Sequence, residues 1–153
     1  MPIEVPHHDR CPFCRHVEGG NQFAVVEELD NTLAFLPPRQ NGLGHVLVIP
    51  KRHAPTLLDL EHDEALAIMQ HVRRIAHAIN RAMDPAGLNV FQNNGVTAGQ
   101  TVPHYHVHLV PSYPGDPPGR IFSSGDIERM PHEELLAIAA RIAAHLEPVT
   151  AGR

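Results

Sequence analysis

The spacing of hydrophobic residues along the chain predicts five short strands and two helices. Apolar runs bounded by Gly, Pro, Asn or Asp are typical of strands. They span 23–28, 32–36, 45–50, 87–93 and 104–111. Two longer segments, 61–83 and 131–146, carry apolar residues every three or four positions, which is the period of an amphipathic helix. Together these elements indicate a mixed domain of helices and strands.

No internal repeat and no interior linker divides the chain. Its 153 residues are enough for one domain with a sizeable core. We therefore expect a single domain over 1–147. The Pro- and Gly-rich segment 114–126 is predicted to be a loop, and 148–153 is predicted to be a flexible C-terminal tail.

Charge and composition narrow the classes of partner. The chain has 12 basic and 17 acidic residues, a net charge of -5. Binding to nucleic acid or to an anionic membrane needs a basic surface, so the charge argues against both. No apolar run approaches the roughly 18 residues that span a bilayer. The N-terminal "MPIEVPHHDR" lacks the apolar core of a secretory signal, so we expect a cytoplasmic protein.

Three histidines recur at every second position in "HYHVH": His104, His106 and His108. In a strand, alternate side chains point to the same side and each residue advances ~3.3 Å, so the first and last lie about 13 Å apart. A single metal ion binds imidazole nitrogens at about 2.1 Å, so one ion cannot bind both. The row therefore serves at least two roles.

The cysteines, Cys11 and Cys14, stand three positions apart in "CPFC". They are either ordinary buried thiols, a redox pair or half of a zinc site. A redox pair should follow a strand and open a helix, whereas this pair lies in a Pro-rich N-terminal stretch. His53, just after the predicted strand 45–50, and one histidine of the row would complete a Cys2His2 zinc site. The spacing leaves open whether His104 or His108 is that ligand.

Four stretches together resemble the histidine-triad (HIT) superfamily of nucleotide hydrolases and transferases. They are "LAF" (33–35), "GHVLVIPKRH" (44–53), "NNG" (93–95) and "AGQTVPHYHVHLVP" (98–111). The resemblance implies an α+β fold: an antiparallel sheet of about five strands, one long helix and a C-terminal helix. It also implies a homodimer acting on a small nucleotide substrate.

The resemblance assigns roles to individual histidines. His106 would be the nucleophile that attacks the α-phosphorus and forms a nucleotidyl intermediate, and His108 would contact phosphate oxygens. His45 would support the triad from the neighbouring strand. The cofactor implied is a structural Zn²⁺ held by Cys11, Cys14, His53 and His104.

The nucleotide would lie against a loop and an apolar wall. In "NNGVTAGQT", Gly95 and Gly99 allow backbone N–H groups to approach an anion. The side chains of Asn93, Gln100 and Thr101 are predicted to donate to phosphate. The base pocket is predicted to include Phe13, Phe35 and Leu36.

Two positions depart from the pattern of the superfamily. Pro37 stands where many members carry an Asp or Asn that bonds the ribose hydroxyls, and Ser112 stands where bacterial members commonly carry Arg. The leading substrates are dinucleoside polyphosphates and nucleoside phosphoramidates. The alternatives are a zinc-stabilised nucleotide-binding module with little turnover, and hydrolysis by a catalytic ion held at the last two triad histidines. His62, His71 and His77 are predicted to lie on a solvated helix face.

Overall fold

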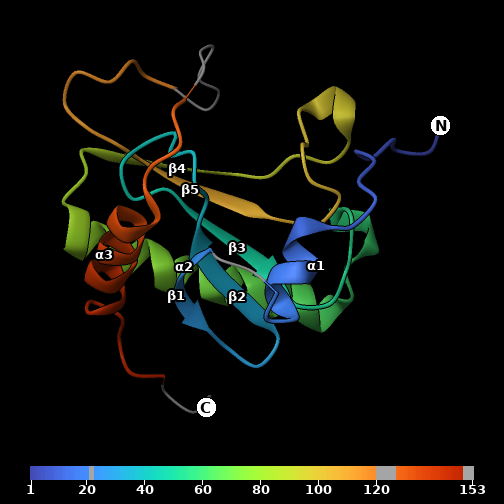
Figure 1. Cartoon of the computed structure of the whole chain (residues 1–153), viewed down its shortest axis with the longest axis horizontal. Helices are drawn as coiled ribbons and strands as arrows, with labels where there is room; N and C mark the ends of the chain where they lie inside the picture. Colours follow the sequence, from blue (N-terminus) through green and yellow to red (C-terminus); the bar gives the residue numbers. More distant parts are fainter. Residues whose placement is uncertain (21–22, 120–126, 150–153) are drawn as a thin grey trace.

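The computed structural model describes residues 1–20, 23–119 and 127–149. Within them the predicted α+β fold is confirmed, with one five-stranded antiparallel sheet, a long helix and a C-terminal helix (Figure 1). The strands are β1 (Ala24–Glu28), β2 (Thr32–Leu36), β3 (Val46–Pro50), β4 (Gly87–Phe91) and β5 (Val107–Ser112). The helices are α1 (Pro12–Val17), α2 (His62–Met83) and α3 (His132–Ala143), with short 3-10 turns η1 (Leu57–Asp59) and η2 (Val96–Ala98).

The sheet has the order β1-β2-β3-β5-β4, and its register aligns residues that are far apart in the sequence. Phe35 pairs with Leu47, Leu47 with His108, and His108 with Phe91. Because side chains directly opposite each other in a sheet point to the same face, these four form one row across β2, β3, β5 and β4. This row carries a histidine of the predicted triad.

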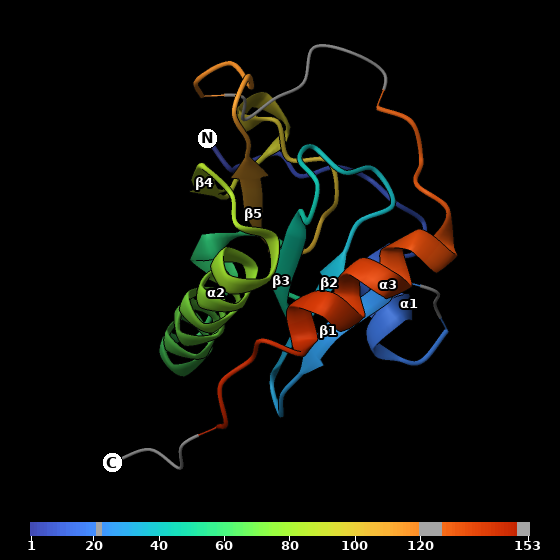
Figure 2. The same cartoon turned by 90° about the vertical axis from the view of Figure 1, so that its left-hand side faces the viewer.

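The alternation of side chains along the strands builds two cores, one on each face of the sheet. Alternate positions of β2, β3 and β5 pack against the apolar stripes of α2 and α3. The intervening positions of β2 and β3 pack with Phe13 of α1 on the other face. Figure 2 shows α2 and α1 on opposite sides of the strands. Among the described residues, no helix combines the length and the apolar character needed to cross a membrane.

The prediction for the polar face of the long helix is wrong for His71. Its side chain is buried, and Nδ1 lies 2.8 Å from the Thr32 hydroxyl oxygen while Nε2 faces the Glu27 carboxylate at 3.2 Å. His71 sits one helical turn from Ile68 and Ile75, so it belongs to the buried stripe of α2. His62 and His77 are exposed, as predicted.

The predicted strand 104–111 is too long at its start. β5 begins at Val107, so His104 and His106 lie in an irregular segment before it. There the backbone N–H of Tyr105 donates to the carbonyl of Ala54 (2.7 Å), which joins this segment to the chain just after β3. His45 likewise lies one residue before β3. The triad therefore straddles the start of a strand.

Candidate functional site

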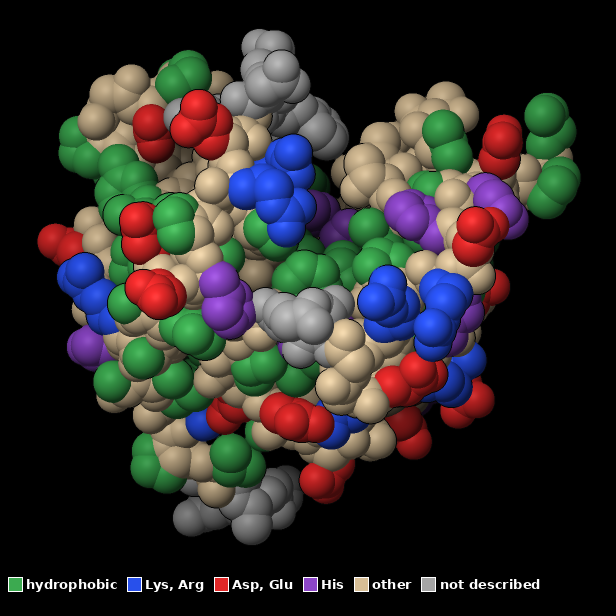
Figure 3. Space-filling view, viewed as in Figure 1, with side chains coloured by type: hydrophobic (Ala, Val, Ile, Leu, Met, Phe, Trp, Pro, Cys, Tyr) green, Lys and Arg blue, Asp and Glu red, His purple; other side chains and the backbone are tan. Residues whose placement is uncertain are grey.

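A pocket of about 880 Å³ opens on the α1 side of the sheet, and His106 and His108 of the triad line it. In Figure 3 the molecule is hollowed there, with His and hydrophobic side chains inside the hollow and Lys or Arg side chains at its edge. Its polar lining includes His45, His106, His108 and Thr101, and its apolar lining includes Phe13, Phe23, Phe35 and Leu47. A second pocket, of about 570 Å³, lies between the β1–β2 turn and α2 and contains none of the triad histidines.

The ring of His106 is held in one orientation by a backbone carbonyl. Its Nδ1 lies 2.7 Å from the carbonyl oxygen of His104, and a carbonyl only accepts, so Nδ1 carries the hydrogen. In the neutral ring, Nε2 therefore keeps its lone pair at the pocket. Burial lowers the pKa of His106, although the bond to the carbonyl offsets part of this. The ring also packs edge-on against Phe13, with centroids 5.4 Å apart.

A relay of hydrogen bonds orients His108. The N–H of Asn41 donates to Nδ1 of His45 (3.3 Å), so Nε2 of His45 carries the hydrogen and donates to Nδ1 of His108 (3.0 Å). This leaves the hydrogen of His108 on Nε2, available to a ligand. Phe91 stacks on the same ring, with centroids 4.5 Å apart and planes 6° from parallel. Burial is the main cause that lowers the pKa of His45 to about 3 and that of His108 to about 2.

The four residues of the predicted metal site lie together. The thiol and imidazole ligand atoms of Cys11, Cys14, His53 and His104 are all within 4.8 Å of one another. Nδ1 of His104 is 3.5 Å from each Sγ, and Nδ1 of His53 is 3.2 Å from Sγ of Cys14. Donors of a tetrahedral zinc stand roughly 3.3–3.8 Å apart, so the cluster has the dimensions of such a site. Of the two histidines that the spacing left open, His104 is the one that lies in this cluster.

The surroundings of this cluster fit a divalent cation. Nε2 of His104 donates to the carbonyl of Pro50 (2.7 Å), which leaves Nδ1 unprotonated toward the cysteines. Burial and the neighbouring Cys11 raise the pKa of the Cys14 thiol to about 12. Two thiolates this close need a cation between them, and a bound metal supplies that charge.

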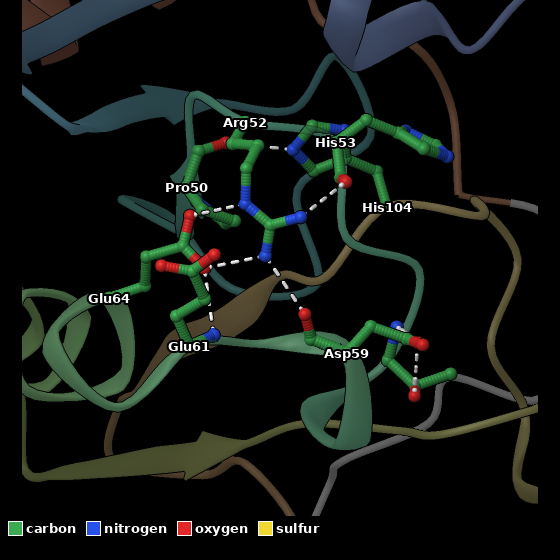
Figure 4. A network of polar contacts seen from close by, with 8 residues as sticks. Pro50, Arg52, His53, Asp59, Glu61, Glu64 and His104 are labelled. Atoms are coloured by element: carbon green, nitrogen blue, oxygen red, sulfur yellow. Dashed lines mark hydrogen bonds and ion pairs between the residues drawn. The ribbon is translucent and has the colours of Figure 1, made fainter.

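Arg52 fixes the segment that carries His53. Its guanidinium donates twice to the Glu64 carboxylate (2.7 Å each) and once to the carbonyl of Asp59 (2.8 Å). Figure 4 shows this side chain between the start of α2 and the turn after β3, with His53 and His104 beside it. The ion pair therefore joins the segment that carries His53 to the long helix α2.

The loop between β4 and β5 is arranged differently from the prediction. The side chain of Gln100 is buried, accepts from the N–H of Gly95 (2.7 Å) and donates to the carbonyls of Pro55 (2.7 Å) and Val102 (2.9 Å). Both of its N–H groups are thus used within the protein, and the expectation that they donate to phosphate is wrong. Gln100 instead holds the loop in shape.

The other predicted loop residues differ in where they lie. Thr101 lines the pocket, whereas Asn93 and Gly99 are not among its lining residues. Gly99 and Gly95 adopt φ values of 90° and 92°, which favour glycine. A Cβ on Gly95 would lie 2.6 Å from the side chain of Ile3, so this glycine is also required for packing of the N-terminal segment.

Two of the three residues predicted for the base pocket lie at this pocket. Phe13 and Phe35 line the pocket, but Leu36 is fully buried in the core against α2. The reason is the period of two: Leu36 follows Phe35 in β2 and faces the opposite side of the sheet. The same period would have identified Leu47, opposite Phe35, as a lining residue.

Comparisons with known proteins identify the family. The HIT domain family matches residues 18–115. "Protein hit" of Bacillus subtilis is 38% identical over 139 residues, covering 90% of this chain and 95% of that protein. The chain belongs to the HIT family. Its structure is similar to a Hit-like protein from Bartonella henselae, with a TM-score of 0.82, 29% identity and coverage of 92% and 99% of the two chains.

Other HIT proteins have names that describe a metal or an activity. A Zn-bound histidine triad family protein from Mycobacterium smegmatis superposes with a TM-score of 0.74 at 31% identity, covering 88% of this chain and 93% of that chain. Adenosine 5′-monophosphoramidase hnt1 of Schizosaccharomyces pombe is 38% identical over 101 residues, which are 66% of this chain and 73% of that protein. The asymmetrical bis(5′-nucleosyl)-tetraphosphatase of the same yeast is 40% identical over 84 residues, 55% and 43% of the two chains.

The pocket of this HIT protein extends beyond the matched domain. Three lining residues, Ile127, Glu128 and Arg129, come from the segment before α3. No motif in the sequence indicated them, because the segment is polar and irregular. The N–H of Met130 donates to the carbonyl of Pro38 (2.8 Å), and this bond draws the segment to the pocket wall.

Proposed function

We propose that this HIT protein cleaves nucleoside phosphate derivatives at the α-phosphorus through a covalent nucleotidyl-His106 intermediate. The observation that carries the proposal is the hydrogen bond from Nδ1 of His106 to the His104 carbonyl (2.7 Å), because it leaves Nε2 as the nucleophilic atom. The lowered pKa of His106 keeps that nitrogen unprotonated at neutral pH.

The reaction has two displacements. In the first, the Nε2 lone pair of His106 forms a bond to the α-phosphorus while the bond from phosphorus to the leaving group breaks. In the second, water forms the new bond to phosphorus and releases a proton to solvent, while the N–P bond breaks and its electron pair returns to Nε2, which releases the nucleotide and restores His106. Nε2–H of His108 and the hydroxyl of Thr101 would donate to the phosphate oxygens, where negative charge gathers in the transition state.

We propose that the cluster of Cys11, Cys14, His53 and His104 holds a structural zinc. With all four positions of a tetrahedron filled by protein, such a zinc has no open position for substrate. Its role would be to join α1, the turn after β3 and the segment before β5. His104 lies two residues before His106, so this anchor also holds the backbone that carries the nucleophile.

Dinucleoside polyphosphates and nucleoside phosphoramidates are the proposed substrate classes. The names of the two yeast relatives and the apolar wall of Phe13, Phe23 and Phe35, which suits a planar base, support them. The test is turnover of diadenosine polyphosphates and adenosine phosphoramidate by wild type and by His106→Ala. Tight AMP binding with no turnover of either class would instead favour a nucleotide-binding module.

We also propose that the protein is a homodimer. β4 lies at the edge of the sheet and pairs with β5 on one side, and Val90 on this strand is 47% exposed. An edge strand with unpaired backbone groups is suited to pairing with a second copy. Light scattering on the purified protein would give the mass of a dimer, and a monomer mass at micromolar concentration would contradict the proposal.

A further inference from the structure

Two arginines face each other at the rim of the histidine pocket. Arg39 and Arg129 form an isolated antiparallel β-bridge, and both line the pocket. The N–H of Met130, one residue after Arg129, donates to the carbonyl of Pro38, one residue before Arg39. In an antiparallel bridge this pattern makes the two arginines a non-hydrogen-bonded pair. In such a pair the Cα atoms are about 4.5 Å apart and the side chains point to the same side.

The backbone beneath Arg39 is held in place by Gln40. The Gln40 amide donates to the carbonyls of Pro37 (2.8 Å) and His45 (3.0 Å), and its oxygen accepts from the N–H groups of Gly44 (3.1 Å) and His45 (2.9 Å). The turn that presents Arg39 is thus bonded directly to His45, the partner of His108. The two arginines therefore line the same pocket as His45 and His108, beside the proposed reaction site.

The pair is unfavourable in the free protein. Like charges directly opposite each other in a sheet destabilise the pairing. Within residues 1–20, 23–119 and 127–149, neither guanidinium is in an ion pair, and Glu128, the neighbouring acid in the lining, is in none either. Both arginines are exposed and so reachable from solvent. An anion bound between the two guanidinium groups would convert this repulsion into attraction.

We propose that Arg39 and Arg129 form a second phosphate-binding site, which selects nucleotides that carry a phosphate in addition to the one attacked by His106. The proposal rests on the proposed function, since it assumes that the α-phosphate lies at the triad. Guanidinium groups bind phosphate through paired, charge-assisted hydrogen bonds. The additional phosphate belongs either to the 5′ chain of a polyphosphate or to the ribose of a bisphosphate, and both offer negatively charged phosphate oxygens to the two guanidinium groups.

The test compares affinities for four ligands by calorimetry: AMP, adenosine 5′-(α,β-methylene)diphosphate, adenosine 3′,5′-bisphosphate and adenosine 2′,5′-bisphosphate. In wild type, at least one of the three ligands with two phosphates should bind about tenfold or more tightly than AMP. The double variant Arg39→Gln/Arg129→Gln should lose most of this gain while its affinity for AMP changes little. Arg73→Gln, an exposed arginine on α2 outside this pocket, is the matched control.

The ligand that binds more tightly than AMP identifies which additional phosphate the arginines bind. A gain for the methylene diphosphate assigns the site to the polyphosphate chain, and a gain for a bisphosphate assigns it to the ribose. If AMP binds but no second phosphate improves affinity, or if the double variant keeps the gain, the arginine site is wrong. If AMP itself does not bind, the proposed function fails instead. In the ligand-free protein, Arg39→Gln should leave the Tm unchanged or raise it; a marked fall would mean that Arg39 has a structural role.

Discussion

Nε2 of His45 donates to Nδ1 of His108 over 3.0 Å, and this bond decides which nitrogen of His108 faces the ligand. His45→Ala removes the donor and frees His108 to adopt the other tautomer. One such hydrogen bond contributes about 1–2 kcal/mol, so we expect kcat to fall about tenfold with a smaller change in KM. Steady-state kinetics of His45→Ala beside His77→Ala, an exposed histidine, measures this. A variant with unaltered kcat would remove His45 from the relay.

Replacing His106 by Ala should abolish the covalent route. Since Nε2 of His106 is the proposed nucleophile, kcat should fall by orders of magnitude, while AMP affinity changes only a few-fold because the aromatic wall and His108 remain. Rapid quenching of wild type during turnover, with prompt neutralisation, should trap a nucleotidyl group on His106. The same quench of His106→Ala should trap none. Near-normal turnover by the variant would exclude the nucleophile assignment.

Local patterns predicted most of the fold and the centre of the site. The period of two placed the strands, the period of three to four placed α2, and the triad and CPFC motifs supplied residues that the fold brings together. The failures have physical causes. Leu36 and Phe35 are both apolar, so hydrophobicity alone could not tell the core face from the pocket face. His71 is a polar residue, yet its ring is buried between Thr32 and Glu27 of neighbouring strands, a contact that no local pattern indicates.

The pocket wall before α3 could not be predicted, because it depends on a long-range backbone bond. Arg129 reaches the rim because the N–H of Met130 donates to Pro38, a contact between segments with no shared pattern. The role of Gln100 could not be predicted from the sequence for a related reason. An amide beside glycines in a loop serves equally well as a ligand donor or as an internal brace, and tertiary contacts decide between them.

The metal cluster gives a prediction about composition and stability. Protein purified without chelators should contain one zinc per chain, and Cys14→Ser should lose it because three donors remain. Structural zinc contributes on the order of 10 kcal/mol in small domains, so the Tm of the variant should drop markedly. Elemental analysis and thermal unfolding test this beside His62→Ala, an exposed histidine outside the cluster. Wild type that contains no zinc would remove the assignment.

Burial of His71 predicts that the protein loses stability in mild acid. Burial lowers its pKa, and the Glu27 carboxylate offsets part of that shift. The unfolded chain therefore takes up the proton first, near the ordinary histidine pKa of about 6.5. The contribution of neutral His71 to the free energy of unfolding is fully present above that pH. It is lost as the pH falls toward the pKa of His71 in the folded state, by at most about 1.4 kcal/mol per pH unit.

His71→Gln should flatten this dependence. Urea unfolding of wild type and variant between pH 7.5 and 5, values chosen to bracket the histidine pKa of about 6.5, gives the free energy of unfolding at each pH. The slope of the variant should be smaller, because one buried titrating group is gone. His77→Gln, an exposed position on the same helix, should keep the wild-type slope. Parallel curves for wild type and His71→Gln would show that other groups cause the acid sensitivity.

Pro37 gives the prediction that bears most on substrate choice. In many members of the superfamily that this chain resembles, an Asp or Asn at this position bonds the ribose hydroxyls. Here the ring lines the pocket with no side-chain acceptor, and the Pro37 carbonyl already accepts from the Gln40 amide (2.8 Å). A binding site that hydrogen-bonds a hydroxyl of its substrate discriminates strongly against substrates that lack this hydroxyl. Without that bond, ribo- and 2′-deoxyribonucleotide substrates should differ by less than ~10-fold in kcat/KM, or about 1.4 kcal/mol.

Substitution at Pro37 tests the cause of this weak discrimination. Pro37→Asp should restore a preference for ribose, because the new carboxylate can accept from the 2′- and 3′-hydroxyls. Pro37→Ala is the control that removes the ring without adding an acceptor, and it should leave the two sugars equivalent. Asn41 also lines the pocket and carries an amide oxygen. If wild type strongly prefers ribose and Asn41→Ala abolishes that preference, Asn41 has taken over the role, and Pro37 does not set the sugar selectivity.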